Sequence, residues 1–441
     1  MSKTTTNNPI CLIDTTDMDN EKWLAVREHG LGKTEDDPDY IPFTITGSGA
    51  SCALGVNPWT SDEEYRDRKM GIKPVLDAAF NEESKAAGHI FEPFVAINFL
   101  RYMHKEFPDA KIRLIKDCFR DILPYLKDVC PDTAEYEAYK ADHVKAVNRF
   151  FKKWKINPSA MYQCGVTGED GTLKYPFALA NIDGLVEING KRGIFEAKTT
   201  GCHNPGIRNY WESGKIPPYY YWQLVFYMAV MNLDFAYITC CWGFTLNDMA
   251  VICLERDMEV ERELMDYLAA FVDDMANNIP LEESKSDPNI VSNYYFRRFG
   301  EAKESDKSVE LPPYCKKMVS KALALDEEIR KAEEAVEKLK QDSVKIYNEF
   351  HSIMENHAYA TIKMDDDLTY GIKLKTPMHR ASFDENRFKE EQPDIYSEVS
   401  TVKIDLTKLG KKYKSIKTMY TIPATPDPTK QPSFSIYRYG D

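Results

Sequence analysis

Two strand-like runs joined by Asn189-Gly190 form the feature that most restricts how this chain can fold. The runs read FALANIDGLVEI and KRGIFEAKTT, and both are rich in apolar and β-branched residues. Asn-Gly is favoured in two-residue hairpin turns because both central positions need positive φ angles. The sequence therefore predicts an antiparallel β-hairpin whose second strand ends near Glu196 and Lys198.

Glu196 and Lys198 project from one face of the second strand, because side chains alternate between the two faces. Asp183 lies on the partner strand, within reach of both. In phosphodiester hydrolysis, carboxylates hold Mg²⁺, which polarises the phosphate and lowers the pKa of a bound water, and a lysine orients or helps deprotonate that water. The backbone carbonyl of Ala197 can supply another oxygen ligand.

A simpler interpretation is a surface ion pair between Glu196 and Lys198, worth about 0–1 kcal/mol. The spacing alone is a weak signal, since E-x-K also begins at Glu83, Glu283 and Glu301. None of those three ends an apolar strand or follows an Asp-bearing strand through a hairpin turn. The context therefore singles out Glu196.

Three further residues favour an active site. Glu92 is a carboxylate on an otherwise apolar helix predicted over 84–102, where an unpaired charge is costly and a metal ion is one way to satisfy it. Gln223 and Tyr227 lie four residues apart on one face of a helix predicted over 217–233. Each of the three alone has an ordinary explanation, such as a capped or snorkelling side chain, but together they strengthen the active-site hypothesis.

The order of the predicted elements indicates an α/β (α+β) core over residues 20–280. Around the hairpin, the pattern predicts helices over 20–30, 84–102, 217–233 and 259–279, a turn that opens a helix within 45–55, a mostly helical stretch over 106–160, and strands over 234–244 and 249–257.

The remaining segments are predicted to lie outside that core. Residues 1–19 form an N-terminal tail, and the polar, proline-bearing stretch 281–313 suggests a linker. Residues 314–357 carry apolar positions spaced alternately three and four apart, which predicts a coiled coil or a long helix packed on a partner. Residues 358–441 are expected to be a small basic module.

The basic character of that module comes from its last 71 residues, 371–441, which hold 13 Lys and Arg against 9 Asp and Glu, with aromatic residues interleaved. This composition suits nucleic acid, and a small folded module with a basic surface explains it equally well.

Composition narrows the class of protein. The net charge of −13 argues against a protein coated in positive potential, although a basic groove on an acidic body remains compatible with it. The ten cysteines include no CxxC pair, which argues against an iron-sulfur cluster or a disulfide framework. No apolar run is long enough to span a membrane and the N-terminus shows no secretory signal, so we expect a cytoplasmic protein.

The chain resembles the PD-(D/E)XK nuclease superfamily, and more closely the YqaJ-type viral recombinases related to lambda exonuclease. The resemblance covers about residues 20–280. It is carried by motifs in order: WLAVR with Trp23 and Arg27, ITGS ending at Ser48, GHIFE with Gly88 and Glu92, NIDG with Asp183, FEAK with Glu196 and Lys198, and QLVFY with Gln223 and Tyr227.

The resemblance implies a mixed central sheet flanked by helices and a set of site residues. It implies Mg²⁺ (or Mn²⁺) ligation by Glu92, Asp183 and Glu196, with Lys198 at the attacking water and Gln223 positioning that water or the lysine. Arg27 and Ser48 would hold the phosphate at a DNA 5′ end, and Tyr227 would support its helix. Residues 106–160 would be a helical insertion.

The implied function is a phage or prophage exonuclease that degrades one strand of linear duplex DNA from a 5′ end in the bacterial cytoplasm. Double-stranded DNA ends and a single-strand annealing protein are the expected partners, and the resemblance implies a ring-shaped homo-oligomer. Two alternatives stay open: a DNA-end binding or scaffold protein with weak cleavage, and a defence or CRISPR-adaptation nuclease of the same superfamily.

Overall fold

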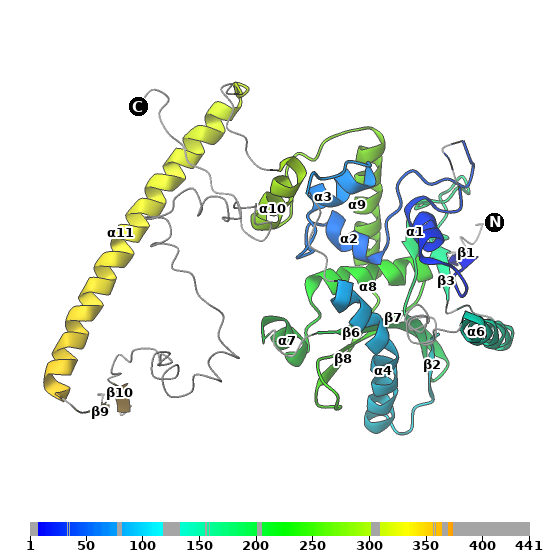
Figure 1. Ribbon diagram of the computed structural model, residues 1–441, viewed down its shortest axis with the longest axis horizontal. Coiled ribbons are helices and arrows are strands. Elements are labelled where there is room, and N and C mark those ends of the chain that lie inside the picture. Colours follow the sequence, from blue (N-terminus) through cyan, green and yellow to red (C-terminus); the bar gives the residue numbers. More distant parts are fainter. Residues whose placement is uncertain are drawn as a thin grey trace, which may run out of the picture. The chain divides into compact units, whose positions relative to one another are not determined.

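The computed structural model of the 441-residue chain divides it into two compact units (Figure 1). The described residues up to 300 belong to the first unit, and those from 309 onward to the second. The structure describes residues 8–32, 34, 36–76, 82–117, 133–154, 157, 159–200, 205–300, 309–355, 357, 359–363 and 369–373.

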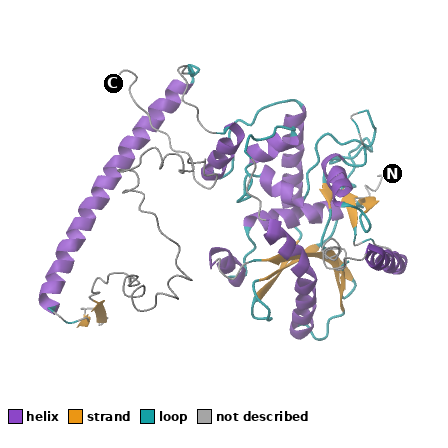
Figure 2. Cartoon of the chain, viewed as in Figure 1, coloured by secondary structure: helices purple, strands orange, loops and turns teal. Residues whose placement is uncertain are grey.

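A five-stranded mixed sheet forms the centre of the first unit (Figure 2). Its strands, in spatial order, are β2 (Ile112–Ile115), β5 (Gly184–Ile188), β6 (Lys191–Thr199), β7 (Phe235–Cys241) and β8 (Met249–Glu255). The β6–β7 pair is parallel, and the other three pairs are antiparallel. The predicted mixed α/β fold class is confirmed.

The hairpin that the sequence predicted joins β5 to β6. Ile188 pairs with Lys191, and the two turn residues Asn189 and Gly190 have φ angles of 50° and 86°. These positive angles are the reason why the turn needs asparagine and glycine.

Helices cover both faces of this sheet. Phe195 and Ala197 of β6 pack with Val95 and Phe99 of α4 (Glu82–Glu106), and the rings of Phe195 and Phe99 lie 4.9 Å apart. Ile194, one position earlier on the strand, belongs to the cluster built with α8 (Pro218–Met231) and α9 (Met258–Ala276). Since neighbouring strand residues face opposite ways, β6 is clamped between α4 and α8, and Glu196 and Lys198 share the face of α8.

A second, three-stranded sheet lies on the N-terminal side of the domain. It contains β1 (Ile10–Asp14), β3 (Ala160–Gln163) and β4 (Leu179–Ala180), all antiparallel. The other described helices before α9 are α1 (Asn20–His29), α2 (Gly47–Ala53), α3 (Asp62–Lys69), α6 (Thr133–Trp154) and α7 (Pro205–Glu212). The prediction that residues 1–19 form only a tail is wrong, because β1 pairs with β3.

The expected helical insertion 106–160 is likewise only partly helical. Residues 112–115 are β2, an edge strand of the main sheet, and α6 covers 133–154. Residues 118–132, between them, lie outside the described residues.

The predicted linker 281–313 contains a helix of the first unit, α10 (Pro288–Phe299). Tyr294 on this helix is 1% exposed, and Arg297 makes two hydrogen bonds of 2.8 and 2.7 Å to the carboxylate of Glu64 on α3. Asp62, at the start of α3, accepts bonds from Ser286 and from the backbone of Lys285. These contacts make residues 284–299 part of the domain.

The second unit contains α11 (Cys315–Met354), a helix of 40 residues, and a hairpin of β9 (Tyr359–Lys363) and β10 (Thr369–Lys373). The helix occupies the segment where the heptad pattern predicted one. Most of the predicted basic module, with its interleaved aromatic residues, lies outside the described residues.

In the part of the chain that the structure describes, no helix is both long enough and apolar enough to cross a membrane.

Truncation tests where the first unit ends. A chain ending at Ala302 should keep the free energy of unfolding of the first unit, whereas a chain ending at Pro280 should lose about 3–5 kcal/mol, because it leaves Glu64 unpaired and removes the buried Tyr294. Urea denaturation followed by far-UV circular dichroism measures both. Equal stabilities for the two truncated chains would show that α10 contributes nothing to the core.

Candidate active site

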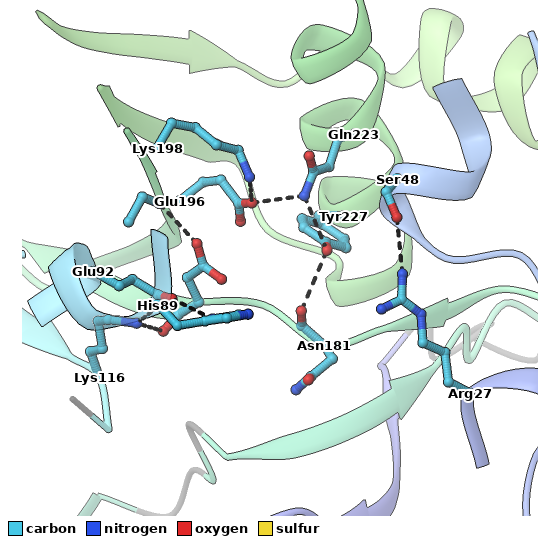
Figure 3. A network of polar contacts seen from close by, with 12 residues as sticks. Arg27, Ser48, His89, Glu92, Lys116, Asn181, Glu196, Lys198, Gln223 and Tyr227 are labelled. Atoms are coloured by element: carbon cyan, nitrogen blue, oxygen red, sulfur yellow. Dashed lines mark hydrogen bonds and ion pairs between the residues drawn. The ribbon is translucent and has the colours of Figure 1, made fainter. Parts of the chain in front are cut away.

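Glu196 is the centre of a buried polar network near the end of β6 (Figure 3). Its side chain is 2% exposed, and Oε1 accepts hydrogen bonds from Lys198 Nζ at 2.6 Å and from Gln223 Nε2 at 2.7 Å. Its other oxygen, Oε2, is buried and has no hydrogen-bond partner among the described residues. The strand and α8 thus converge on one carboxylate that retains unused acceptor capacity.

Asp183 immediately precedes β5 and faces the end of β6. Its Oδ2 accepts a 2.9 Å hydrogen bond from the backbone N–H of Ala197, the residue between Glu196 and Lys198. The register of the hairpin fixes this contact, since Gly184 pairs with Phe195. Two carboxylates and the Ala197 backbone are therefore gathered at one end of the hairpin.

Glu92 approaches from α4, on the other side of β6. It is 8% exposed and bonded to the ammonium of Lys116, which also donates a 2.9 Å hydrogen bond to the backbone carbonyl of Asp183. His89, one turn earlier on α4, lies 3.7 Å from Glu92 through Nδ1. Lys116, whose side chain is 1% exposed, links Glu92 to the Asp183 segment.

Lys116 was missed by the sequence-based reasoning. It directly follows β2, a strand of four residues in a stretch that the pattern indicated to be helical. The available signal was the short alternation of IRLI before the lysine, which is too brief to distinguish a strand from a helix.

The carboxyl groups of this cluster carry negative charge that the neighbouring lysines neutralise only in part. Burial, together with the neighbouring Asp183, raises the pKa of Glu196 to about 8. Burial and the Glu92 carboxylate raise the pKa of Asp183. Burial lowers the pKa of Lys198, but Glu196 and Asp183 outweigh it, so the pKa of Lys198 is raised and the side chain is an ammonium at neutral pH.

The cluster opens into a cavity of about 350 Å³. Tyr220 lines it, and Lys198 Nζ lies 4.8 Å from the centre of that ring. The cavity is lined by Gly88, His89, Glu92, Val95, Asp183, Ala197, Lys198, Thr199 and Tyr220.

The donor set fits a hard divalent cation in chemistry. Oxygen ligands from carboxylates and a backbone carbonyl are those that Mg²⁺ prefers, and the raised pKa values of Asp183 and Glu196 reflect negative charge that a cation would neutralise. Among the described residues, no three His, Cys, Asp or Glu side chains converge as a ready-made metal cluster. Lys116 and Lys198 each lie against one of the carboxylates.

Gln223 and Tyr227 connect the site to the segment that follows β4. Gln223 Nε2 lies 3.2 Å from the Tyr227 hydroxyl, which lies 3.4 Å from the backbone carbonyl of Asn181. A Cβ at Gly47 of α2 would meet the Tyr227 ring at 2.5 Å, so a glycine is needed for α2 to pack against α8. Tyr227, packed against α2, therefore holds Gln223 on the side away from Glu196.

Arg27 and Ser48 form a separate group beyond Tyr227. Arg27 Nη2 donates to Ser48 Oγ at 2.9 Å and to Thr46 Oγ1 at 3.0 Å, and the guanidinium lies 4.9 Å from the Trp23 ring centre. These two partners are neutral hydroxyls, which do not offset the positive charge of the guanidinium, and this suits an anion. Thr46 was not predicted as a member of this group.

The structure thus brings Glu92, Asp183, Glu196, Lys198 and Gln223 together, with Tyr227 behind them, and it brings Arg27 to Ser48. The catalytic, metal-binding and phosphate-binding roles of these residues stay predictions.

Removing one negative charge from the cluster should stabilise the protein when no divalent cation is present. An ionised carboxyl whose pKa is higher in the native than in the unfolded state destabilises the native state, so Asp183→Asn in EDTA should raise the free energy of unfolding by on the order of 1 kcal/mol at pH 8. The asparagine oxygen can still accept the Ala197 N–H.

The raised pKa of Asp183 also determines how the stabilisation by Asp183→Asn changes with pH. The penalty grows as pH rises from the unfolded pKa through the raised native pKa, so the gain from Asp183→Asn should shrink toward pH 4. Urea titrations of both proteins at the two pH values measure it. A variant that is less stable than the parent at pH 8 would contradict the electrostatic account.

Comparisons with known proteins find a family match over the part of the chain that contains most of this site. Residues 133–234, which contain the hairpin and the whole of α8, match the family model described as YqaJ-like viral recombinase domain. No curated protein matches the chain in a sequence comparison.

Two solved structures of an alkaline exonuclease from Laribacter hongkongensis, the second in complex with dAMP, are similar at 16% and 17% sequence identity. Each comparison covers 54% of this chain and 89% of that chain, with TM-scores of 0.31 and 0.30, which are too low to carry an argument. The resemblance to the YqaJ-type viral recombinases, which the ordered motifs predicted, is confirmed by the family match over residues 133–234.

Proposed function

We propose that this chain is a metal-dependent DNA exonuclease that hydrolyses phosphodiester bonds of linear duplex DNA from a 5′ end. The observation that carries the proposal is the buried Glu196 carboxylate, bonded to Lys198 and Gln223 beside Asp183 and Glu92, within or next to the stretch that matches a viral recombinase domain. The single strand left behind would serve recombination by strand annealing in a phage or prophage setting.

Mg²⁺, or Mn²⁺ in its place, is the proposed cofactor, held by Glu92, Asp183, Glu196 and the carbonyl of Ala197. When bound there, the ion supplies charge stabilisation for the phosphate and lowers the pKa of a coordinated water. The carboxylates bring the charge that holds it, and the burial of Glu92 and Glu196 limits the screening of that charge by bulk water.

Lys198 is the proposed catalytic cation. As an ammonium it can donate a hydrogen bond to the attacking water or to the phosphate oxygen on which negative charge develops. Gln223 holds the Glu196 oxygen that Lys198 also contacts, so it positions both partners. Tyr227 in turn holds Gln223.

Arg27 and Ser48 are the proposed site for a terminal 5′ phosphate. A guanidinium and a hydroxyl together offer several donors to phosphate oxygens, and the Arg27 fork suits bidentate contact. We further propose a ring-shaped homo-oligomer that works with a single-strand annealing protein in the cytoplasm of the bacterial host.

Strand-resolved cleavage tests the function. Linear duplex DNA, 5′-phosphorylated and labelled on each strand in turn, should lose nucleotides from 5′ ends with Mg²⁺ and remain intact with EDTA. Lys198→Ala should lower the rate about 100-fold or more, because it removes a donor aimed at developing charge. DNA that is bound but not cut would instead favour the end-binding or scaffold alternative.

The 5′-phosphate site has its own test. Arg27→Ala should reduce the preference for 5′-phosphorylated over 5′-hydroxyl ends about tenfold or more and leave the rate on hydroxyl ends nearly unchanged, since a charge-assisted bond to phosphate contributes about 1.5–3 kcal/mol. Arg262→Ala, an exposed arginine on α9, is the control. A preference that survives in Arg27→Ala rules out this role.

A further inference from the structure

Helix α11 exposes an apolar seam along its length, interrupted at Ser343. If its heptad positions are lettered a to g, with Ala322 at a and Leu325 at d, every a and d position except Ser343 carries an apolar side chain or, at Cys315, a thiol. Seven of the larger ones are between 48% and 80% exposed: Met318, Leu325, Ile329, Val336, Leu339, Ile346 and Ile353. A row of this kind on a 40-residue helix is typical of a surface that another helix covers.

The charged residues of the helix leave that seam clear. Arg330 at b pairs with Glu327 at f at 2.7 Å and also contacts Glu334 at f, and Lys331 at c lies 3.2 Å from Glu327. All four residues occupy positions on the side away from the a and d seam. These charges are paired within the helix on its outer face, and the apolar residues of the seam are exposed among the described residues.

We propose that α11 forms a parallel, two-stranded coiled coil with α11 of a second copy of this chain. The residues in the first half of the helix point to two parallel strands. Ile329 and Val336, both β-branched, occupy consecutive a positions, and Leu325 and Leu339 occupy d positions, which is the combination that favours parallel dimers. The second half departs from this pattern, with isoleucine at the d positions 346 and 353.

The residues that flank the seam are compatible with this orientation. In a parallel pair, Lys321 at g faces Asp326 at e of the other copy, an attractive contact that occurs twice. Glu328 at g faces Glu333 at e, a repulsive contact that also occurs twice. The two contacts offset each other, so the a and d residues set the orientation.

The proposal goes beyond the nuclease function, because the heptad register and exposure of α11 do not depend on the active site. Its consequence is that two first units are tethered through their chains to one coiled coil. A DNA end engaged by one unit would then have a second nuclease unit held at high local concentration.

Two leucines provide a matched pair of variants. Leu325 at d is 48% exposed and Leu323 at b is 49% exposed, so in an isolated helix the two are equivalent. In the coiled coil only Leu325 is buried. Leu325→Glu should therefore lower the mass of the full-length protein in sedimentation equilibrium at micromolar concentration, because it removes the pairing through α11, whereas Leu323→Glu should leave the mass unchanged.

Cys315 reports the orientation. It is a thiol at position a of the first turn, so in a parallel, in-register pair the two Cys315 residues face each other at a distance that a disulfide can bridge. In an antiparallel pair they would lie about 60 Å apart, at roughly 1.5 Å per residue. Oxidation of the full-length protein by copper-phenanthroline, which removes one electron and one proton from each thiol, should give a covalent dimer that is absent in Cys315→Ser.

The possible outcomes are distinct. A lowered mass for Leu325→Glu alone, with a covalent dimer that depends on Cys315, supports the proposal. Equal masses for Leu325→Glu and Leu323→Glu overturn it, as does a pair that Leu325→Glu disrupts but Cys315 does not cross-link, which is the antiparallel result. Cleavage of DNA by the parent protein is unaffected by either result, so failure here is distinguishable from failure of the nuclease function.

Discussion

The desolvated carboxylate of Glu196 is the constraint on which the first unit depends. Removing an ionised group from water costs several kcal/mol unless partners replace the lost hydration, and Glu196 recovers only part of that through Lys198 and Gln223. Those two partners come from β6 and α8, so the carboxylate can be satisfied only when the sheet and the helix are docked. The chemistry of the site and the packing of the domain are therefore one arrangement.

The alternation of β6 explains how a charged site coexists with a close-packed core. Phe195 and Ala197 face α4 and contribute to its apolar cluster, while Glu196 and Lys198 face α8. Asp183 accepts a hydrogen bond from the Ala197 N–H at the end of β6. Glu92, on α4, is linked to the Asp183 segment by Lys116. Burial and the neighbouring carboxylates raise the pKa values of Asp183 and Glu196 and lower stability, which is a frequent property of functional sites.

The local features of this fold were predictable where a short pattern has one physical meaning. Asn189-Gly190 specified the hairpin, strand alternation placed Glu196 beside Lys198, and the four-residue spacing of Gln223 and Tyr227 put them on one helix face. The heptads of residues 314–357 likewise predicted the helix now seen over 315–354.

What the sequence could not reveal depends on contacts between distant segments. Lys116 belongs to the site only because β2 joins the sheet beside β5, and four residues are too few to establish that strand from periodicity. The polar composition of residues 281–313 suggested a linker, yet Asp62 and Glu64 of α3 hold that segment through side chains that composition does not reveal. Similarly, β1 is a strand only because β3, far along the chain, pairs with it.

Binding of Mn²⁺ to the full-length protein, followed by electron paramagnetic resonance, tests the central claim most directly. The parent protein should remove Mn²⁺ from the free, six-line spectrum in a saturable way. Glu196→Gln, which keeps the shape of the side chain and removes its charge, should weaken this binding at least tenfold. Equal binding by the parent protein and Glu196→Gln would contradict the claim that this buried carboxylate holds the catalytic metal.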